Sequence, residues 1–368
     1  MKKSIFIPTF GNRPQPLVGR DAIIDDFMDG LAHPEGHPNR ATILMGQRGT
    51  GKTAILLELA VRAAEKGYVV ASTTVREQML DDILQLVQTK GQKYVKNKKH
   101  VQGVNAGALG FSIGLTFTEE IKQNYGFRLK LTMLADELAK LDMGVLILVD
   151  EILSNTSQLK ELAITYQHLV GEGKNVAIAM AGLPGAISNV LHDDVLTFLN
   201  RAQKVWLGPL PLNDVSVFYS DCFTQEGKAI EANTLDFAVR ATLGYPYLMQ
   251  LIGFHILKYT SKSEIIEKNN VEAAIISAKR ELVDNVHIPC MKPLSDKDRD
   301  FLTAMSADGE SSRIADIRTR MGVSAAYVQQ YRNRLIEAGV ILSDQRGRVE
   351  FAVPYLGEYL RGELETPY

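Results

Sequence analysis

The sequence predicts an α/β protein in which a parallel sheet, with helices on both faces, is followed by a helical lid domain and a winged helix-turn-helix domain. Over roughly the first 200 residues, apolar runs of strand length alternate with helical patterns, the order typical of a doubly wound sheet. Strand signals end near Pro211, where a series of helical patterns begins. After Pro293 the order becomes helix, helix, helix and hairpin.

The length and composition suit a folded protein of several domains. A chain of 368 residues is long for one core, and we expect boundaries at residues 1–208, 209–292 and 293–368. Hydrophobic residues make up 45%, charged residues 23%, and the formal net charge is -2. This balance excludes a disordered or globally basic chain, so any nucleic-acid surface must be local.

The cysteines and the apolar runs indicate where the protein resides. Cys222 and Cys290 lie far apart and match no metal spacing, which favours structural thiols in a reducing compartment and leaves a disulfide as the alternative. No apolar run approaches the about 20 residues that span a bilayer, and the amino-terminal stretch lacks the apolar core of a signal peptide. We expect a cytoplasmic protein with no membrane partner.

The first domain alternates helices and strands in a regular order. Apolar residues at helical spacing predict helices, and short apolar runs predict buried strands. The expected helices are Ala22–Leu31, Thr53–Lys66, Glu77–Val87, Lys130–Lys140 and Gln158–Val170; the expected strands are Ala41–Met45, Tyr68–Thr74, Val145–Val149, Asn175–Ala181 and Lys204–Leu207. The lysine-rich stretch Lys90–Lys99 is interpreted as a solvated helix end and loop, with a nucleic-acid patch as the alternative. Val101–Phe117 is interpreted as an inserted hairpin.

A glycine-rich loop joins the first strand to a helix. Residues 46–53 read Gly-Gln-Arg-Gly-Thr-Gly-Lys-Thr and fit the pattern G-x-x-x-x-G-K-[ST] without a mismatch. In such a loop, backbone N–H groups and a helix N-terminus surround the phosphates of a nucleotide. We therefore expect Lys52 to contact the β- and γ-phosphates and the Thr53 hydroxyl to bind Mg²⁺. The expected nucleotide contacts are Gly46, Gln47, Arg48, Gly49, Thr50, Gly51, Lys52, Thr53 and Ala54.

Two carboxylates follow the apolar strand Val145–Val149. Because ligands of parallel sheets bind at the carboxyl edge, Asp150 and Glu151 should lie beside the glycine-rich loop. We expect Asp150 to hold Mg²⁺ and Glu151 to orient or deprotonate the attacking water. Together these motifs predict ATP or ADP as the ligand, and hydrolysis in addition to binding.

These motifs resemble those of the AAA+ ATPases, in the branch of archaeal-type ATPases and origin-recognition initiators, with the STAND switch ATPases nearby. Residues 16–21, Pro-Leu-Val-Gly-Arg-Asp, look like the amino-terminal box of that family, which implies adenine contacts from Val18 and Gly19. Residues 243–247, Leu-Gly-Tyr-Pro-Tyr, resemble its G-x-P motif and imply that Pro246 packs near the base. Arg201 stands where the family has an arginine finger, which implies a role in trans within a homo-oligomer; an ordinary surface ion pair is the alternative.

The sequence also departs from the family pattern. The strand Asn175–Ala181 leads into Ala181, Gly182 and Leu183, where many members have a polar sensor residue. No second sensor arginine is evident between Gly244 and Gln250. We therefore expect slow turnover.

The carboxyl-terminal region has the element order of a winged helix-turn-helix. The expected helices are Asp296–Met305, Ile314–Met321 and Ala326–Ala338, and the expected strands are Val340–Leu342 and Val349–Val353. Val328, Tyr331 and Leu335 form the apolar stripe of the third helix. The candidate DNA contacts, on the opposite face and in the wing, are Gln329, Gln330, Asn333, Arg334, Arg346 and Arg348.

Charge argues against strong DNA binding by this region. From Leu294 to the end there are 10 Lys and Arg against 12 Asp and Glu, whereas DNA-binding domains are usually basic. Double-stranded DNA is one expected partner, and a winged domain that contacts protein is the alternative.

Three functions remain open from the sequence. The first is an ATPase that couples its nucleotide state to DNA binding, resembling initiator or transposition-helper ATPases. The second is a STAND-like switch in which bound nucleotide locks the winged domain against the core. The third is a scaffold that binds ATP without hydrolysing it.

Overall fold

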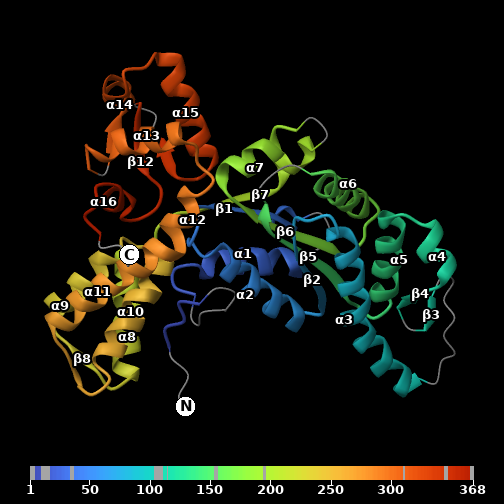
Figure 1. Cartoon of the computed structure of the whole chain (residues 1–368). Helices are drawn as coiled ribbons and strands as arrows, with labels where there is room; N and C mark the ends of the chain where they lie inside the picture. Colours follow the sequence, from blue (N-terminus) through green and yellow to red (C-terminus); the bar gives the residue numbers. More distant parts are fainter. Residues whose placement is uncertain are drawn as a thin grey trace.

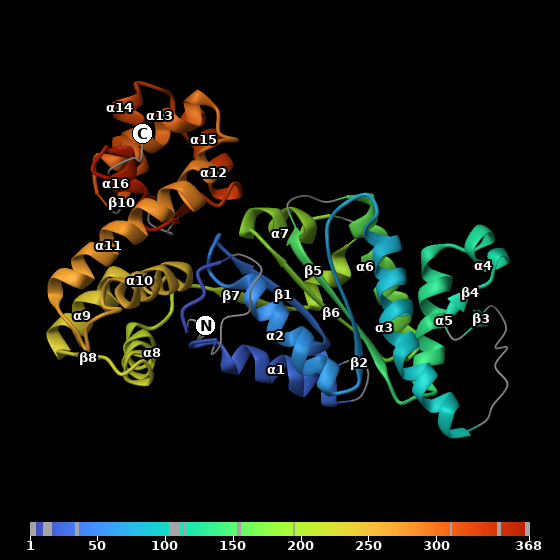
Figure 2. The same ribbon diagram turned by 60° about the horizontal axis from the view of Figure 1, so that its bottom comes forward.

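The computed structural model describes residues 5–9, 17–33, 37–102, 111–113, 115–152, 156–193, 196–309, 311–343 and 347–364. The chain forms two lobes (Figure 1). One lobe contains the parallel sheet and its helices, and the other contains the helices and small sheet that follow residue 211. Figure 2 shows the two lobes joined beside the amino-terminal segment and strand β7.

The large sheet has five parallel strands in the order β2-β5-β6-β1-β7. These strands are β1 (Ala41–Gly46), β2 (Tyr68–Thr74), β5 (Gly144–Ile152), β6 (Val176–Gly182) and β7 (Gln203–Leu207). All five expected strands are present. Strand β6 lies between β1 and β5, the two strands that lead into the predicted site motifs.

Both faces of the sheet are covered by helices, which explains why its strands are apolar throughout. Side chains alternate between the faces: Ile147 of β5 packs on one side and Leu148 on the other. One face is covered by α3 (Met79–Gln102), α5 (Phe127–Ala139), α6 (Ser157–Gly171) and α7 (Pro184–Leu191); the other is covered by α1 (Asp21–Ala32) and α2 (Lys52–Glu65). The predicted doubly wound sheet is confirmed.

Helix α3 corrects the interpretation of the lysine-rich stretch. The backbone is helical through Gln102, whereas a helix end and loop had been expected over Lys90–Lys99. At its start the helix packs on the sheet through residues such as Ile83 and Val87, and straight-chain lysines continue a helix at little cost in free energy. Only part of the expected hairpin is described: β3 (Phe111–Ile113) pairs antiparallel with β4 (Thr116–Phe117), and the short helix α4 (Glu119–Asn124) follows.

The region after Pro211 is helical, as expected. Its helices are α8 (Leu212–Gln225), α9 (Ala232–Ala241), α10 (Pro246–Tyr259), α11 (Lys268–Leu282) and α12 (Ile288–Met291). A π-helical turn at Val283–His287 joins the last two, so the helical run continues from α11 into α12. Two short strands, β8 (Ala229–Ile230) and β9 (Ile265–Ile266), pair in parallel and were not anticipated.

The carboxyl-terminal elements follow the expected order, with two additions, β10 and α16. The elements are α13 (Asp296–Ser306), β10 (Ser311–Arg313), α14 (Ile314–Met321), α15 (Ala325–Glu337), β11 (Ile341–Ser343), β12 (Arg348–Phe351) and α16 (Leu356–Leu360). Strand β12 pairs antiparallel with both β10 and β11. Strand β10 reads Ser-Ser-Arg and lacks the apolar residues that indicated β11, so it was not predicted.

A single apolar cluster continues from the helical region into the carboxyl-terminal elements. It includes Tyr219 of α8, Ile252 of α10, Phe301 of α13 and Leu335 of α15. The expected boundary at residue 293 therefore crosses a continuous core, and the division into three domains stays a prediction.

The amino-terminal segment belongs to this second lobe. Phe6 is fully buried and makes edge-on contacts with Phe218 and Tyr219. A Cβ placed on Gly253 of α10 would lie 2.2 Å from the Phe6 ring, so glycine is required there for the ring to fit. Residues 5–9 are thus fixed against α8 and α10 by side-chain packing.

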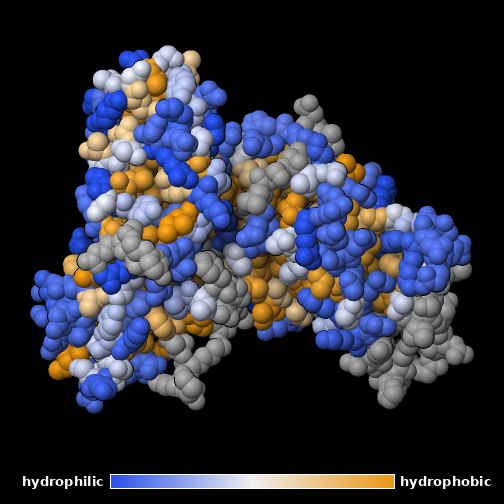
Figure 3. Space-filling view, in the orientation of Figure 1, coloured by the Kyte–Doolittle hydropathy of each residue, from blue (hydrophilic) through white to orange (hydrophobic). Residues whose placement is uncertain are grey.

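In the part of the chain that the structure describes, no helix is both long enough and apolar enough to cross a bilayer. The face seen in Figure 3 is mostly hydrophilic over α3 and α4.

Candidate functional site

The loop between β1 and α2 adopts a conformation that depends on glycine. Gly49 and Gly51 have φ values of +75° and +92°, in the left-handed region that L side chains rarely adopt. At Gly46 the limit is space, because an added Cβ would lie 2.6 Å from Thr50 Oγ1 and 2.9 Å from the Leu207 carbonyl oxygen. Substitution at any of these three glycines would therefore distort the loop.

Lys52 is the first residue of α2, and its side chain turns back over the loop. Its ammonium group donates to the carbonyl oxygens of Gly46 at 2.8 Å and Gln47 at 2.7 Å. Burial lowers the pKa of Lys52 to about 8, although the Asp150 carboxylate acts in the opposite direction. Among the described residues the cation is bonded to neutral carbonyl groups alone, so an anion at the loop could take their place.

Asp150 meets the start of α2 across the carboxyl edge of the sheet. Thr53 Oγ1 donates to Asp150 Oδ2 at 2.6 Å, and the Glu151 backbone N–H donates to Asp150 Oδ1 at 2.8 Å. The carboxylate is thereby fixed in orientation beside a hydroxyl oxygen. Carboxylate and hydroxyl oxygens are hard ligands that suit Mg²⁺, so Thr53 and Asp150 fit a magnesium site.

Glu151 has an unusual backbone conformation. Its φ is +55°, and the pairing of β5 with β6 is interrupted between Val149 and Ile152 by an extra residue on β5. A non-glycine residue in this region is strained by about 1–3 kcal/mol, and bulges often redirect a side chain at the end of a strand. Glu151 is exposed and lines the same hollow as Asp150.

The predicted residues surround one pocket of about 430 Å³. Eleven of the residues that line it had been predicted as site residues from the sequence: Val18, residues 48–54, Asp150, Glu151 and Pro246. Gly19, Gly46 and Gln47 do not line it. Gly19 lies close to Leu210 and Asp214 instead, and Gly46 lies close to Thr50 and Leu207.

Leu183 confirms a departure noted in the sequence. Strand β6 ends at Gly182, and both Gly182 and Leu183 line the pocket between the glycine-rich loop and the acidic pair. An apolar side chain therefore occupies the position at which a polar sensor residue was expected in related proteins. Leu183 cannot position a water molecule by hydrogen bonding.

Several lining residues were not anticipated. Ile7, Pro8 and Thr9 approach from the amino-terminal segment, and the Ile7 N–H donates to Gln250 Oε1 at 2.9 Å. Arg20 lines the pocket too, and it is anchored through a 2.6 Å bond to the Gly208 carbonyl oxygen.

The loop is tied directly to helix α10 and the turn before it. The buried Tyr245 hydroxyl donates to the Arg48 carbonyl oxygen, and the Tyr247 N–H donates to the Gly49 carbonyl oxygen at 3.3 Å. Burial raises the pKa of Tyr245, so the hydroxyl remains a donor. The tyrosines beside Pro246 thus join the glycine-rich loop to the second lobe.

The loop also contacts the end of α15. The Gln47 side chain is buried and lies against Gly339, where an added Cβ would be 2.6 Å from Gln47 Oε1. Nearby, a Cβ on Gly185 of α7 would lie 2.3 Å from the Glu337 backbone. Gly185 and Gly339 therefore permit α15 to pack closely against the sheet lobe next to the loop.

Arg201 lies outside the pocket. It ends the short 3₁₀ helix Thr197–Arg201, its side chain is exposed, and it does not line the hollow around Lys52. This position is compatible with a contact to another chain.

The candidate DNA contacts are partly engaged within the molecule. Gln329, Gln330 and Asn333 are exposed, and Gln329 bonds to Asn333 at 2.9 Å. Arg334 is exposed, as expected, and it also donates to the buried Asp298 at 2.8 Å. Arg348 bonds to Ser311 at 2.6 Å. Arg346 lies outside the described residues.

Comparisons with known proteins support the fold. Residues 284–360 match the model of a family described as a domain of unknown function, DUF8462. No curated protein matches the sequence. The structure is similar to a Walker-type ATPase of Pyrococcus abyssi, with 15% identity, a TM-score of 0.70, and coverage of 97% of this chain and 99% of the other.

Two further solved structures have the same architecture. The ORC2 protein of Aeropyrum pernix, in its ADPNP-ADP complexes, is 13% identical with a TM-score of 0.65 and 98% coverage of both chains. Cdc6p from Pyrobaculum aerophilum is 14% identical with a TM-score of 0.52, covering 97% of this chain and 98% of the other. Over nearly its whole length the chain therefore shares the fold of these solved structures.

Proposed function

We propose that this protein binds ATP with Mg²⁺ and hydrolyses it slowly. One observation carries the proposal: Lys52, Thr53, Asp150 and Glu151, which come from two separated strand ends, line one pocket, and Thr53 and Asp150 are in direct contact. An acidic pair that merely ended a strand in solvent would not be expected to lie beside a phosphate-binding loop.

Each residue has a distinct role in this proposal. Loop N–H groups and Lys52 bind the phosphates and neutralise the charge that develops on them. Mg²⁺, held by Thr53 and Asp150, would supply a Lewis acid at the phosphate oxygens. Glu151 orients a water molecule in line with the γ-phosphate and accepts its proton. Val18 and Pro246 pack on the base.

Slow turnover follows from the residue between the two motifs. The Leu183 side chain offers no hydrogen bond to the attacking water. In this proposal Glu151 therefore orients that water without help from the end of β6. Arg201 of a second copy would stabilise the transition state in a homo-oligomer.

The decisive experiment measures Mg²⁺-dependent phosphate release by wild-type protein and by Lys52→Ala, with Lys66→Ala as an exposed lysine control. We expect hydrolysis that Lys52→Ala abolishes and Lys66→Ala leaves intact. Equal rates for wild type and Lys52→Ala, or no ATP binding by wild type, would overturn the proposal.

Coupling to DNA through α15 is the finer part of the proposal. Gln329, Gln330 and Asn333 offer donors and acceptors suited to base edges. Phosphate release is therefore also measured with duplex DNA, and we expect a Lys52-dependent stimulation. The buried, unpaired cysteines fit a cytoplasmic protein.

A nucleotide switch is the second candidate, and the contact of α15 with the loop favours it. Gln47 lies within the glycine-rich loop, and its buried Oε1 has no hydrogen-bond partner in the structure while it faces Gly339. A shift of the loop on nucleotide binding would therefore displace the residues at the end of α15. Co-purifying ADP with negligible turnover and no binding to DNA at low salt would favour this switch over the DNA-coupled ATPase.

A further inference from the structure

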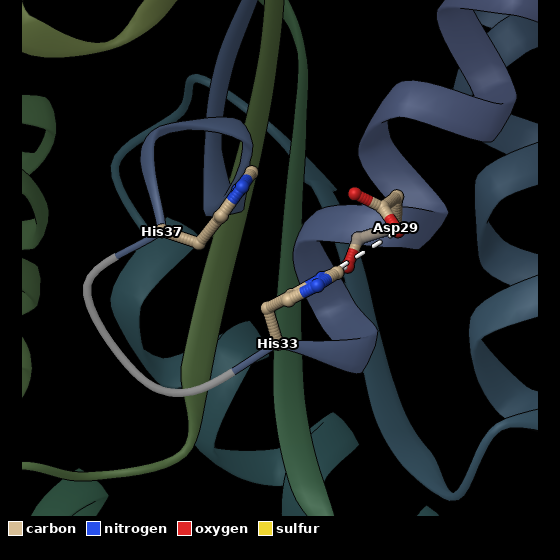
Figure 4. A group of neighbouring side chains, drawn as sticks. All are labelled: Asp29, His33 and His37. Carbon is tan, nitrogen blue, oxygen red and sulfur yellow. Dashed lines mark hydrogen bonds and ion pairs between the residues drawn. The ribbon is translucent and has the colours of Figure 1, made fainter.

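A cluster of metal-binding side chains lies at the opposite edge of the sheet from the nucleotide pocket. Asp29 lies in the last turns of α1, His33 follows the end of that helix, and His37 precedes the 3₁₀ helix Pro38–Arg40 that leads into β1. One potential ligand atom from each residue lies within 4.8 Å of the others. Figure 4 shows Asp29 and His33 joined by a dashed line, with His37 nearby on the segment that leads into β1.

The backbone around the cluster is held in place independently of the three side chains. Asn39 donates to the Asp26 carbonyl oxygen at 2.9 Å, and Arg40 donates to the His33 carbonyl oxygen at 3.2 Å. A Cβ on Gly30 would lie 2.7 Å from Asn39 Cβ and 3.2 Å from His37 Nδ1. Glycine inside a helix costs about 1 kcal/mol relative to alanine, and here it permits the approach of His37 to α1.

The geometry matches a late first-row divalent cation. His33 Nδ1 lies 3.5 Å from Asp29 Oδ1, about the separation of two ligand atoms that share one tetrahedral metal ion with bonds of roughly 2.0–2.1 Å. The two imidazole rings are stacked, with their centroids 5.3 Å apart. Two imidazoles and a carboxylate favour Zn²⁺ over Mg²⁺, which prefers oxygen ligands.

We propose that Asp29, His33 and His37 bind one Zn²⁺ ion, with water as the fourth ligand. The metal takes the place of the proton that His33 Nδ1 shares with the Asp29 carbonyl oxygen at 2.8 Å. His37 Nδ1 accepts a long 3.3 Å bond from the Asn39 N–H, and a metal bound at this nitrogen would displace that donor. Both contacts compete with the metal and weaken its binding. The bound ion would cross-link the end of α1 to His37, which precedes the 3₁₀ helix that leads into β1.

The test uses the tag-free full-length protein, treated with a chelator and freed of nucleotide. Zn²⁺ is titrated calorimetrically in excess Mg²⁺, which occupies the carboxylates of the nucleotide pocket. We expect one equivalent of Zn²⁺ to bind to wild type, none to His33→Ala/His37→Ala, and one to His168→Ala, which removes another exposed histidine. Excess Zn²⁺ should raise the Tm of wild type by about 3–5 °C and leave that of the double variant unchanged.

Co²⁺ provides a second readout, because a tetrahedral site gives intense visible absorption bands that depend on both histidines. The inference is overturned if wild type binds no Zn²⁺ at 100 μM, or if the double variant, folded with an unchanged metal-free Tm, still binds one equivalent. Lys52→Ala should bind Zn²⁺ like wild type, so failure of the ATPase proposal would leave this result unaffected.

Discussion

Lys52 in the glycine-rich loop and Arg334 on α15 are both cations predicted to meet phosphates, yet they differ in what holds them. The Lys52 ammonium group rests on two neutral carbonyl oxygens, whereas the Arg334 guanidinium is paired with Asp298, whose side chain is only 2% exposed. Giving up a carbonyl costs little, but removing Arg334 takes the cation away from a buried carboxylate that keeps its bonds from the Ser295 N–H and hydroxyl. The bond partner, more than the residue type, distinguishes a group free to bind a ligand from one that maintains the fold.

The largest effect should come from Glu151. Glu151→Gln keeps the shape of the side chain but removes the base, so we expect kcat to fall by about 10²–10³-fold with ATP affinity nearly unchanged. Single-turnover hydrolysis and nucleotide titration measure the two quantities. If turnover is unchanged, Glu151 is not the base, and the non-hydrolysing scaffold becomes the better interpretation.

The backbone strain at Glu151 offers a matched comparison. Glu151→Gly should increase the free energy of unfolding by about 0.5–1 kcal/mol, because glycine tolerates a φ of +55°, while hydrolysis is lost. Asp142 has a φ of +57° and lies outside the pocket, so Asp142→Gly should stabilise the protein without affecting turnover. A stabilised Glu151→Gly that still hydrolyses ATP would contradict the link between strain and function.

The next effect concerns pH. The free protein holds the pKa of Lys52 at about 8, and bound phosphate must raise it. Binding therefore takes up a proton above pH 8, and ATP affinity should fall about fivefold to tenfold between pH 7.5 and pH 9. Calorimetric titration across this range measures the fall. Lys52→Arg, which does not titrate here, should lose the pH dependence; the same slope in that variant would assign it to another group.

The comparison can be sharpened on α15. Arg334→Ala should reduce the free energy of unfolding by about 1–3 kcal/mol, because it leaves Asp298 buried without its ion pair. Gln330→Ala, on the exposed face, should change stability by less than about 0.5 kcal/mol and affect only DNA affinity. Urea denaturation and DNA titration at two salt concentrations separate these effects. Equal stability of the two variants would show that the Asp298 pair contributes little.

The smallest effect should be seen at the contact between α15 and the sheet lobe. Gly185→Ala inserts a methyl group 2.3 Å from the Glu337 backbone, so the carboxyl-terminal elements must shift away from the loop. We expect a few-fold change in ATP affinity and faster proteolysis near residue 339. Gly171→Ala, where an added Cβ meets nothing within 4 Å, is the control. Identical behaviour of both variants would argue against the nucleotide switch.

Sequence reasoning succeeded where the signal was local. Motif and periodicity predicted the glycine-rich loop, the apolar strand before Asp150, and helices α14 and α15. The structure brings Lys52 and Asp150 to one pocket. Sequence reasoning was less successful for pairings distant in sequence. The bond between Arg334 and Asp298 spans 36 positions, and Gln47 faces Gly339, so neither could be found from spacing alone.

The burial of Phe6 constrains how far the two lobes can separate. Phe6 is fixed in the helical lobe, and the chain is beside the sheet lobe by Arg20, which bonds to Gly208. The lobes are thus joined covalently twice, through residues 7–19 and through residues 208–211. Such a double tether favours rotation about a hinge over free separation. An isolated helical lobe would lack the Phe6 ring and, by analogy with the loss of other buried aromatic side chains, about 3–5 kcal/mol of stability.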